Sequence, residues 1–143
     1  MGRLVERMAA RIEEHVRSHL RPGERIKALA LAVEDEPRKK FWAGLISPLA
    51  QAFVQWPLYI VVTDQRFLAL KPALTGKSAE VTISEPLSSV VVERFKRRLL
   101  RSLLVVRAGP ASQPLRVTFG PAWRSRAEAI RAALQGGGQG PPD

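Results

Sequence analysis

Residues 58–70 read Leu-Tyr-Ile-Val-Val-Thr-Asp-Gln-Arg-Phe-Leu-Ala-Leu, two apolar runs on either side of a short polar group, Thr63 to Arg66. The runs are rich in β-branched and aromatic residues, which favour strands. Asp and its polar neighbours favour a tight turn between them. The stretch therefore predicts an antiparallel hairpin with strands at residues 58–63 and 66–71.

The residues of the turn, Thr63 to Arg66, are well suited to a hairpin turn. Thr63 suits the end of a strand, and Asp64 tolerates left-handed geometry and can bond its own backbone. Arg66 is long enough to reach back across the pair and hold carbonyl groups or Asp64. Turn chemistry alone explains these residues, so we predict a structural role for them. A binding role for Asp64 and Arg66 is the alternative.

A strand, then Thr-Asp-x-Arg, then another strand resembles the second and third strands of bacterial pleckstrin-homology-like (PH-like) domains of the YokE-like and GRAM-like kind. The resemblance covers residues 24–134. It implies an α+β, mainly β fold: a PH-like seven-stranded antiparallel bent barrel capped by a C-terminal helix. The sequence itself adds an N-terminal helix before this domain. The resemblance also implies a protein that binds a partner without transforming it. The long connection 34–57 and the N-terminal helix depart from the family pattern.

The flanking sequence supplies the remaining elements. Leu4, Met8, Ile12 and Val16 recur every four residues and predict an amphipathic helix over residues 3–20. Further strands are expected at residues 26–33, 79–84, 87–95, 99–107 and 115–119, with a basic turn at 96–98, and a final helix is expected from Pro121 to a stop at Gly136 to Gly138. We divide the chain into an amphipathic helix (1–22), a PH-like domain (23–135) and a disordered tail (136–143).

Charge is concentrated in one part of the chain. The net charge is +10, and residues 94–131 hold ten Arg or Lys against one acid, Glu128, whereas the first 93 residues are nearly balanced. A one-sided positive field attracts nucleic acid, anionic lipid headgroups or an acidic protein. A solvated arginine-rich surface without a partner is the alternative.

Other features limit the location and the class of protein. Cysteine is absent, which excludes disulfides and thiolate metal sites. The N-terminal residues are charged and amphipathic, unlike a signal peptide. The longest mostly apolar stretch, 41–54, contains Pro48 and is shorter than the roughly 20 residues that span a bilayer. We therefore expect a cytoplasmic protein, peripheral at the inner face of the membrane if it binds lipid.

Catalytic motifs are poorly represented. His15 and His19 share a helix face at a spacing that could bind a metal, but no third ligand is evident. Gly76-Lys77-Ser78 imitates the end of a phosphate-binding loop, yet the first glycine of that motif is replaced by Lys71 and a strand follows. The sequence therefore predicts no enzyme, no cofactor and no metal site.

The first candidate binding site lies in the long connection. Arg38, Lys39 and Lys40 are followed by Phe41 and Trp42. Cations followed by aromatic residues suit a bilayer interface, where basic groups meet anionic headgroups and Trp lies at the boundary. In eukaryotic pleckstrin-homology domains, the equivalent loop holds phosphoinositide headgroups. A small helix packed on the barrel or on a second subunit is the alternative.

The second candidate is the basic hairpin, which comprises Arg94, Lys96, Arg97, Arg98 and Arg101. Alternation places Arg94 and Lys96 on one face of the strand and Phe95 on the other. Crowding of like charges is unfavourable unless an anion or an acidic partner relieves it. A hairpin that merely discourages edge pairing is the alternative.

Two functional hypotheses follow. The first is a non-catalytic module that docks on an acidic membrane surface or an acidic protein partner through both basic clusters. The second is a nucleic-acid-binding protein that uses the charge of residues 94–131. The amphipathic N-terminal helix, with apolar residues on more than one face, would also allow a homo-oligomer.

Overall fold

The computed structural model describes residues 2–34, 56–72, 79–98, 100–109 and 114–138. Helix α1 precedes the sheet and helix α4 follows it. The elements in chain order are α1 (Gly2–Arg17), β1 (Ile26–Glu34), β2 (Trp56–Thr63), β3 (Arg66–Pro72), β4 (Ala79–Pro86), the 3-10 turn η1 (Leu87–Ser89), β5 (Val90–Arg97), β6 (Ser102–Ala108), β7 (Leu115–Phe119), the 3-10 turn η2 (Pro121–Trp123) and α4 (Arg124–Gly138).

The seven strands form one antiparallel sheet in the order β4-β3-β2-β1-β7-β6-β5. The long β1 pairs with β2 along its length and with β7 at its last two residues, Val33 and Glu34, so it connects the two halves of the sheet. Strands β4 and β5 stand at the two ends of the order, and the sheet is bent without being closed. The predicted architecture is confirmed: seven antiparallel strands form a bent sheet, which stays open, with one helix before it and one after it.

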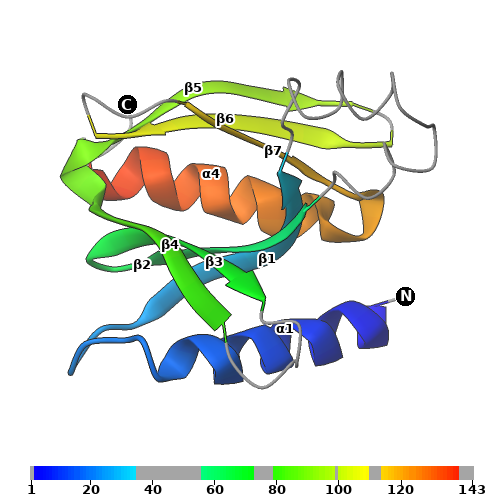
Figure 1. The fold of residues 1–143 in the computed structure, drawn as a ribbon. Helices are drawn as coiled ribbons and strands as arrows, with labels where there is room; N and C mark the ends of the chain where they lie inside the picture. The colour runs from blue at the N-terminus through cyan, green and yellow to red at the C-terminus, as the bar shows by residue number, and fades with distance from the viewer. Residues whose placement is uncertain (1, 35–55, 73–78, 99, 110–113, 139–143) are drawn as a thin grey trace, which may run out of the picture.

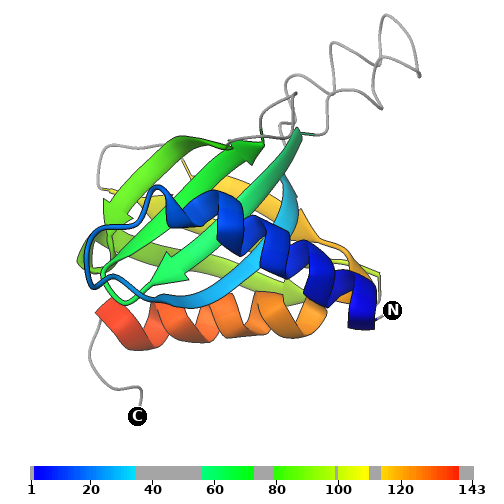
Figure 2. The same ribbon diagram turned by 90° about the horizontal axis from the view of Figure 1, so that it is seen from below.

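The bent sheet and the two helices lie in layers. Helix α4 lies between the β5–β6–β7 half and the β1–β4 half, and α1 lies on the outer side of the β1–β4 half (Figure 1). Seen from below, α1 runs across the strands of that half (Figure 2). The outer face of β5–β7 is therefore the face that no helix of the described residues covers.

Apolar periodicity explains the packing of both helices. In α1, Ile12 and Val16 are buried in the core, and His15 lies 6.3 Å from the ring of Tyr59 on β2. In α4, Ala127, Ile130 and Leu134 recur at helical spacing and are buried in the same core. One continuous core thus joins α1 to the sheet, across the predicted boundary at residue 22.

Several predicted boundaries differ from the structure: the first helix ends at Arg17, β2 begins at Trp56, β4 ends at Pro86 and β6 begins at Ser102. Strand β5 continues to Arg97, which pairs with Ser102, so the turn follows at residues 98–101, where the Arg98 N–H donates to the Arg101 carbonyl at 2.8 Å. The first residues of the predicted 87–95 strand form η1, which is closed by a hydrogen bond from the Val90 N–H to the Leu87 carbonyl. Helix α4 continues through Gly138, since glycine weakens a final turn without forbidding it.

Gly23 adopts a left-handed backbone conformation, so its replacement should lower the stability of the fold. Its φ is +81°, and a Cβ built there would meet no atom within 4 Å. We expect Gly23→Ala to cost about 1 to 2 kcal/mol of unfolding free energy, because L-residues disfavour this geometry. Urea denaturation measures the cost. The control is Gly120→Ala, which has equally open surroundings and an ordinary φ of −68°; equal losses in both variants would contradict the backbone explanation.

Within the described residues, α1 and α4 are both too short or too polar to serve as a membrane-crossing helix.

Candidate functional site

The turn between β2 and β3 is built around the Thr63 hydroxyl. Its Oγ1 accepts hydrogen bonds from the backbone N–H groups of Gln65 at 3.1 Å and Arg66 at 3.0 Å. Described non-glycine residues have no positive φ, so Asp64 does not use the left-handed geometry that it would tolerate. The turn forms at the predicted place, through the side chain of threonine.

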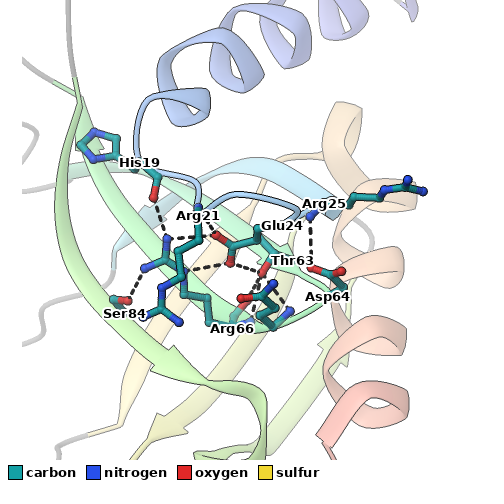
Figure 3. Close-up of polar contacts among 9 residues, drawn as sticks. His19, Arg21, Glu24, Arg25, Thr63, Asp64, Arg66 and Ser84 are labelled. Carbon is teal, nitrogen blue, oxygen red and sulfur yellow. Dashed lines mark hydrogen bonds and ion pairs between the residues drawn. The ribbon is translucent and has the colours of Figure 1, made fainter.

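Glu24 and Arg66 form a bidentate ion pair beneath this turn (Figure 3). Arg66 Nε donates to Glu24 Oε2 at 2.9 Å, and Nη2 donates to Glu24 Oε1 at 3.1 Å. The Glu24 side chain is 0% exposed and that of Arg66 is 11% exposed. Paired planar groups of this kind give both strength and a fixed geometry.

The remaining donors of Arg66 bind two other segments. Nη2 donates to the His19 carbonyl at 2.6 Å, just after α1, and Nη1 donates to Ser84 Oγ on β4 at 2.9 Å. The Thr63 hydroxyl donates to Glu24 Oε2 at 2.6 Å. We call Glu24, Thr63 and Arg66 the buried brace, because they join the segment after α1 to three strands of the sheet.

Asp64 holds the same segment from outside. Its Oδ1 accepts from the Arg25 N–H at 3.0 Å, and its own N–H donates to the Arg25 carbonyl at 2.9 Å. The sequence-based expectation that Asp64 bonds its own backbone is wrong, since its partner lies 39 residues away. Arg66 does hold a carbonyl, as predicted, but the carboxylate that it binds belongs to Glu24.

The environment of Glu24 changes its ionisation. Burial by itself raises the pKa of a carboxyl group, but hydrogen bonds from Arg66, Thr63 and the Arg21 N–H, together with the guanidinium charge, outweigh it. The pKa of Glu24 falls from 4.5 to about 2. The carboxylate is therefore ionised at neutral pH and is engaged on both oxygens.

The buried brace is a structural element. Arg66 is fully engaged by Glu24, His19 and Ser84, and it is shielded from solvent. A ligand would have to displace a buried carboxylate to reach it, which is energetically costly. The exposed cations are therefore the better candidates for binding.

The basic hairpin divides between two sides of the sheet. Arg94 and Lys96 are exposed, whereas Phe95 packs against the core, as the alternation predicts. Strand β5 contains a bulge between Val92 and Arg94, and this bulge determines which side of the sheet the following side chains occupy. Arg94 and Lys96 thus lie on the outer face of β5–β7.

The other side of the hairpin contacts α4. Arg97 forms an ion pair with Glu128, and Arg124 Nη2 donates to the Arg98 carbonyl at 2.7 Å. The guanidinium of Arg131 lies 5.2 Å from the centre of the Phe95 ring, within cation–π range. The positive charge of Arg97 is therefore compensated within the protein by Glu128, the one acidic residue of the 94–131 region.

Strand register adds two arginines to the outer side. Arg94 pairs with Val105 and Val105 pairs with Arg116, so one row crosses β5, β6 and β7. Arg107 lies two residues beyond Val105 on the same face, where its Nε bonds Glu93 at 2.9 Å. We call this surface the outer basic face: Arg94, Lys96, Arg107 and Arg116.

The sequence analysis did not identify Glu24 as the partner of Arg66, or Arg116 as a residue on the same face as Arg94. Glu24 could have been found from the expected antiparallel pairing, because a strand that starts at Ile26 opposite Thr63 brings Glu24 beneath the turn. Arg116 could have been found by aligning the last three strands as consecutive antiparallel neighbours. Both identifications require the register of strand pairing, which amino-acid composition does not provide.

The cluster Arg38, Lys39, Lys40, Phe41 and Trp42 lies outside the described residues, as does Gly76-Lys77-Ser78. The strand ends that flank the 35–55 segment are described. Glu34 pairs with Trp56 on β2 and with Val117 on β7, next to Arg116 in the chain. The chain therefore leaves the sheet from β1, next to β7, and rejoins it on β2, on the other side of β1.

The two histidines have structural contacts. The Nε2 atom of His19 lies 2.8 Å from the Ala79 carbonyl on β4, and His15 contacts Tyr59. A group of three or more side chains suited to hold a metal is not found among the residues that the structure describes. The pair thus helps to attach α1 to the sheet.

No family model and no curated protein matches this chain. Among solved structures, the chain is similar to the Slm1 PH domain, whose crystal structure is a complex with inositol 4-phosphate. The match has a TM-score of 0.43 and 15% sequence identity, and it covers 72% of this chain and 87% of the Slm1 domain.

Proposed function

We propose that this chain is a non-catalytic binding module that docks on an anionic membrane surface. The contact is made by the outer basic face and by Arg98 and Arg101 in the adjoining turn. Residues 38–42 supply a second contact in this proposal, through their three cations and two aromatic side chains. An acidic protein surface is the alternative partner.

One observation carries the proposal: the outer face of β5–β7, which no helix of the described residues covers, is also the cationic face. Among the described residues, Glu93 is the acid that lies with the outer basic face, and Arg107 neutralises it. Arg94, Lys96 and Arg116 are exposed on this face and form no ion pair within the described parts of the chain. Several unneutralised cations on one surface are attracted to anionic lipid over a Debye length.

Nucleic acid is a weaker candidate because stacking platforms are lacking. Single-stranded nucleic acid is usually bound through exposed aromatic side chains beside cations. In the basic region, Phe119 and Trp123 are buried and Phe95 is half-buried beneath Arg131. The described residues of this region therefore present cations without an exposed aromatic surface.

Vesicle sedimentation with charge variants tests the proposal. Each cation at an anionic surface contributes about 1 kcal/mol, so removing three weakens partitioning about 100-fold. We expect this loss for Arg94→Gln/Lys96→Gln/Arg101→Gln, and a comparable loss for Arg38→Gln/Lys39→Gln/Lys40→Gln.

The control removes three exposed arginines from α1, which lies at the opposite end of the molecule from β5 and β6 (Figure 1). The variant Arg3→Gln/Arg7→Gln/Arg11→Gln changes net charge equally. We expect it to retain most of the binding. An equal loss in the control would mean that net charge alone drives association and that no docking surface exists on β5–β7.

A further inference from the structure

A hollow of about 400 Å³ opens on the outer basic face, lined by residues of three strands and the residue before β7. Its lining residues are Glu93, Arg94, Val105, Pro114 and Arg116. The in-register row places Val105 between the two arginines. The hollow therefore has Val105 at its centre and one arginine on each side of it.

The spacing of the two arginines suits one small anion. Neighbouring strands lie about 4.8 Å apart, so residues two strands apart have Cα atoms about 10 Å apart. Arginine is long enough for two such side chains to meet over the residue between them. Val105 is 7% exposed and faces away from the core side that Leu104 and Val106 occupy, so it offers no competing polar group.

Pairing distinguishes these two arginines from their neighbours. Arg97 is bound by Glu128 and Arg107 by Glu93, each through an ion pair. Within residues 2–34, 56–72, 79–98, 100–109 and 114–138, neither Arg94 nor Arg116 has such a partner. Because Glu93 is already held by Arg107 at 2.9 Å, the carboxylate in the lining does not neutralise the pair.

We propose that Arg94 and Arg116 form a binding site for a phosphate monoester. A monoester carries close to two negative charges at neutral pH and three acceptor oxygens, which match two forked guanidinium groups. A phosphodiester has one charge and fewer free oxygens, so it binds more weakly. This inference rests on the proposed docking function, since the site lies within the docking surface.

The test compares lipids that differ in the phosphate group. Vesicles of phosphatidylcholine that contain phosphatidic acid, a monoester, are matched in surface charge to vesicles that contain phosphatidylserine, a diester. We expect the whole chain to prefer the monoester vesicles about tenfold, because charge-assisted hydrogen bonds add to the general attraction. Arg94→Gln/Arg116→Gln removes this preference, and Arg7→Gln/Arg11→Gln, matched in charge, retains it.

A second arm identifies the source of the phosphate. Glycerol 3-phosphate is titrated against the protein without vesicles, and the methyl resonances of Val105 are followed by NMR. Saturable shifts that vanish in Arg94→Gln/Arg116→Gln support the site and show that a soluble monoester suffices. Shifts equal to those produced by sodium chloride, together with a monoester preference on vesicles, restrict the site to lipid headgroups.

The outcomes separate this inference from the docking proposal. Absence of binding to every anionic vesicle overturns the docking function, and with it the lipid form of the site. Equal binding to both kinds of anionic vesicle, with no specific effect of Arg94→Gln/Arg116→Gln on either arm, overturns the monoester site. In that second case the membrane-docking function still stands.

Discussion

Replacing Glu24 with glutamine is expected to lower the free energy of unfolding by about 3 to 5 kcal/mol, since it leaves the buried guanidinium of Arg66 without its counter-charge. The Glu24 carboxylate contacts Arg66, Thr63 and the Arg21 N–H, and its side chain is 0% exposed. For a chain of this size the midpoint of thermal unfolding falls by roughly 10 °C. Calorimetry or urea denaturation measures the loss.

An exposed ion pair of equal length provides the control. Glu93 and Arg107 are also 2.9 Å apart, but their side chains are 35% and 41% exposed. Glu93→Gln is therefore expected to cost less than about 1 kcal/mol. A second variant, Glu24→Leu/Arg66→Met, removes both buried charges, keeps the test valid if Glu24→Gln does not fold, and should recover part of the loss. Similar small losses for Glu24→Gln and Glu93→Gln would contradict the buried brace.

Acid should destabilise the protein through the same carboxylate. The pKa of Glu24 is about 2 in the folded protein against 4.5 ordinarily, so folding favours its ionised form. This contribution is fully present above pH 4.5 and is lost as the pH falls towards 2. It amounts to about 3 kcal/mol, since each pKa unit corresponds to about 1.4 kcal/mol.

Urea denaturation over that pH range isolates the contribution of Glu24. The difference in unfolding free energy between the wild type and Glu24→Gln should shrink as the pH falls from 4.5 to 2, because the wild type loses its carboxylate charge. The difference between the wild type and Glu93→Gln should stay small throughout. A wild-type advantage over Glu24→Gln that is constant across this range would show that the pKa of Glu24 is not lowered.

The hairpin at residues 58–70 shows how far local sequence determines structure. Its strands and turn follow from β-propensity and from the side chains of Thr63 and Asp64, which act within a few residues. The partners of the turn could not be derived in the same way. Glu24 lies 42 residues before Arg66, and only the pairing of β1 with β2 brings them together.

The candidate site shows the same division. Alternation along β5 correctly separates Arg94 and Lys96 from Phe95, because that period is local. Proximity in the sequence groups Arg97 with them, whereas in the structure Arg97 pairs with Glu128 on α4. Arg116 was separated from Arg94 by 22 positions, although the register of β6 places both beside Val105.

The position of the charge matters more than its amount. Composition gives a net charge of +10 and locates the excess in residues 94–131, but the fold distributes those residues over two surfaces. Acidic partners within the chain neutralise Arg97 and Arg107. Arg94, Lys96 and Arg116 form no ion pair within the described residues, and they lie on the outer face of β5–β7, which neither α1 nor α4 covers (Figure 1).

Sedimentation of the whole wild-type chain with vesicles at low salt is the most direct test of membrane docking. We expect binding to phosphatidylcholine vesicles that contain phosphatidylserine, little binding to pure phosphatidylcholine, and progressive release as salt screens the outer basic face. Equal binding to both vesicles, or no binding to either at low salt, would contradict it.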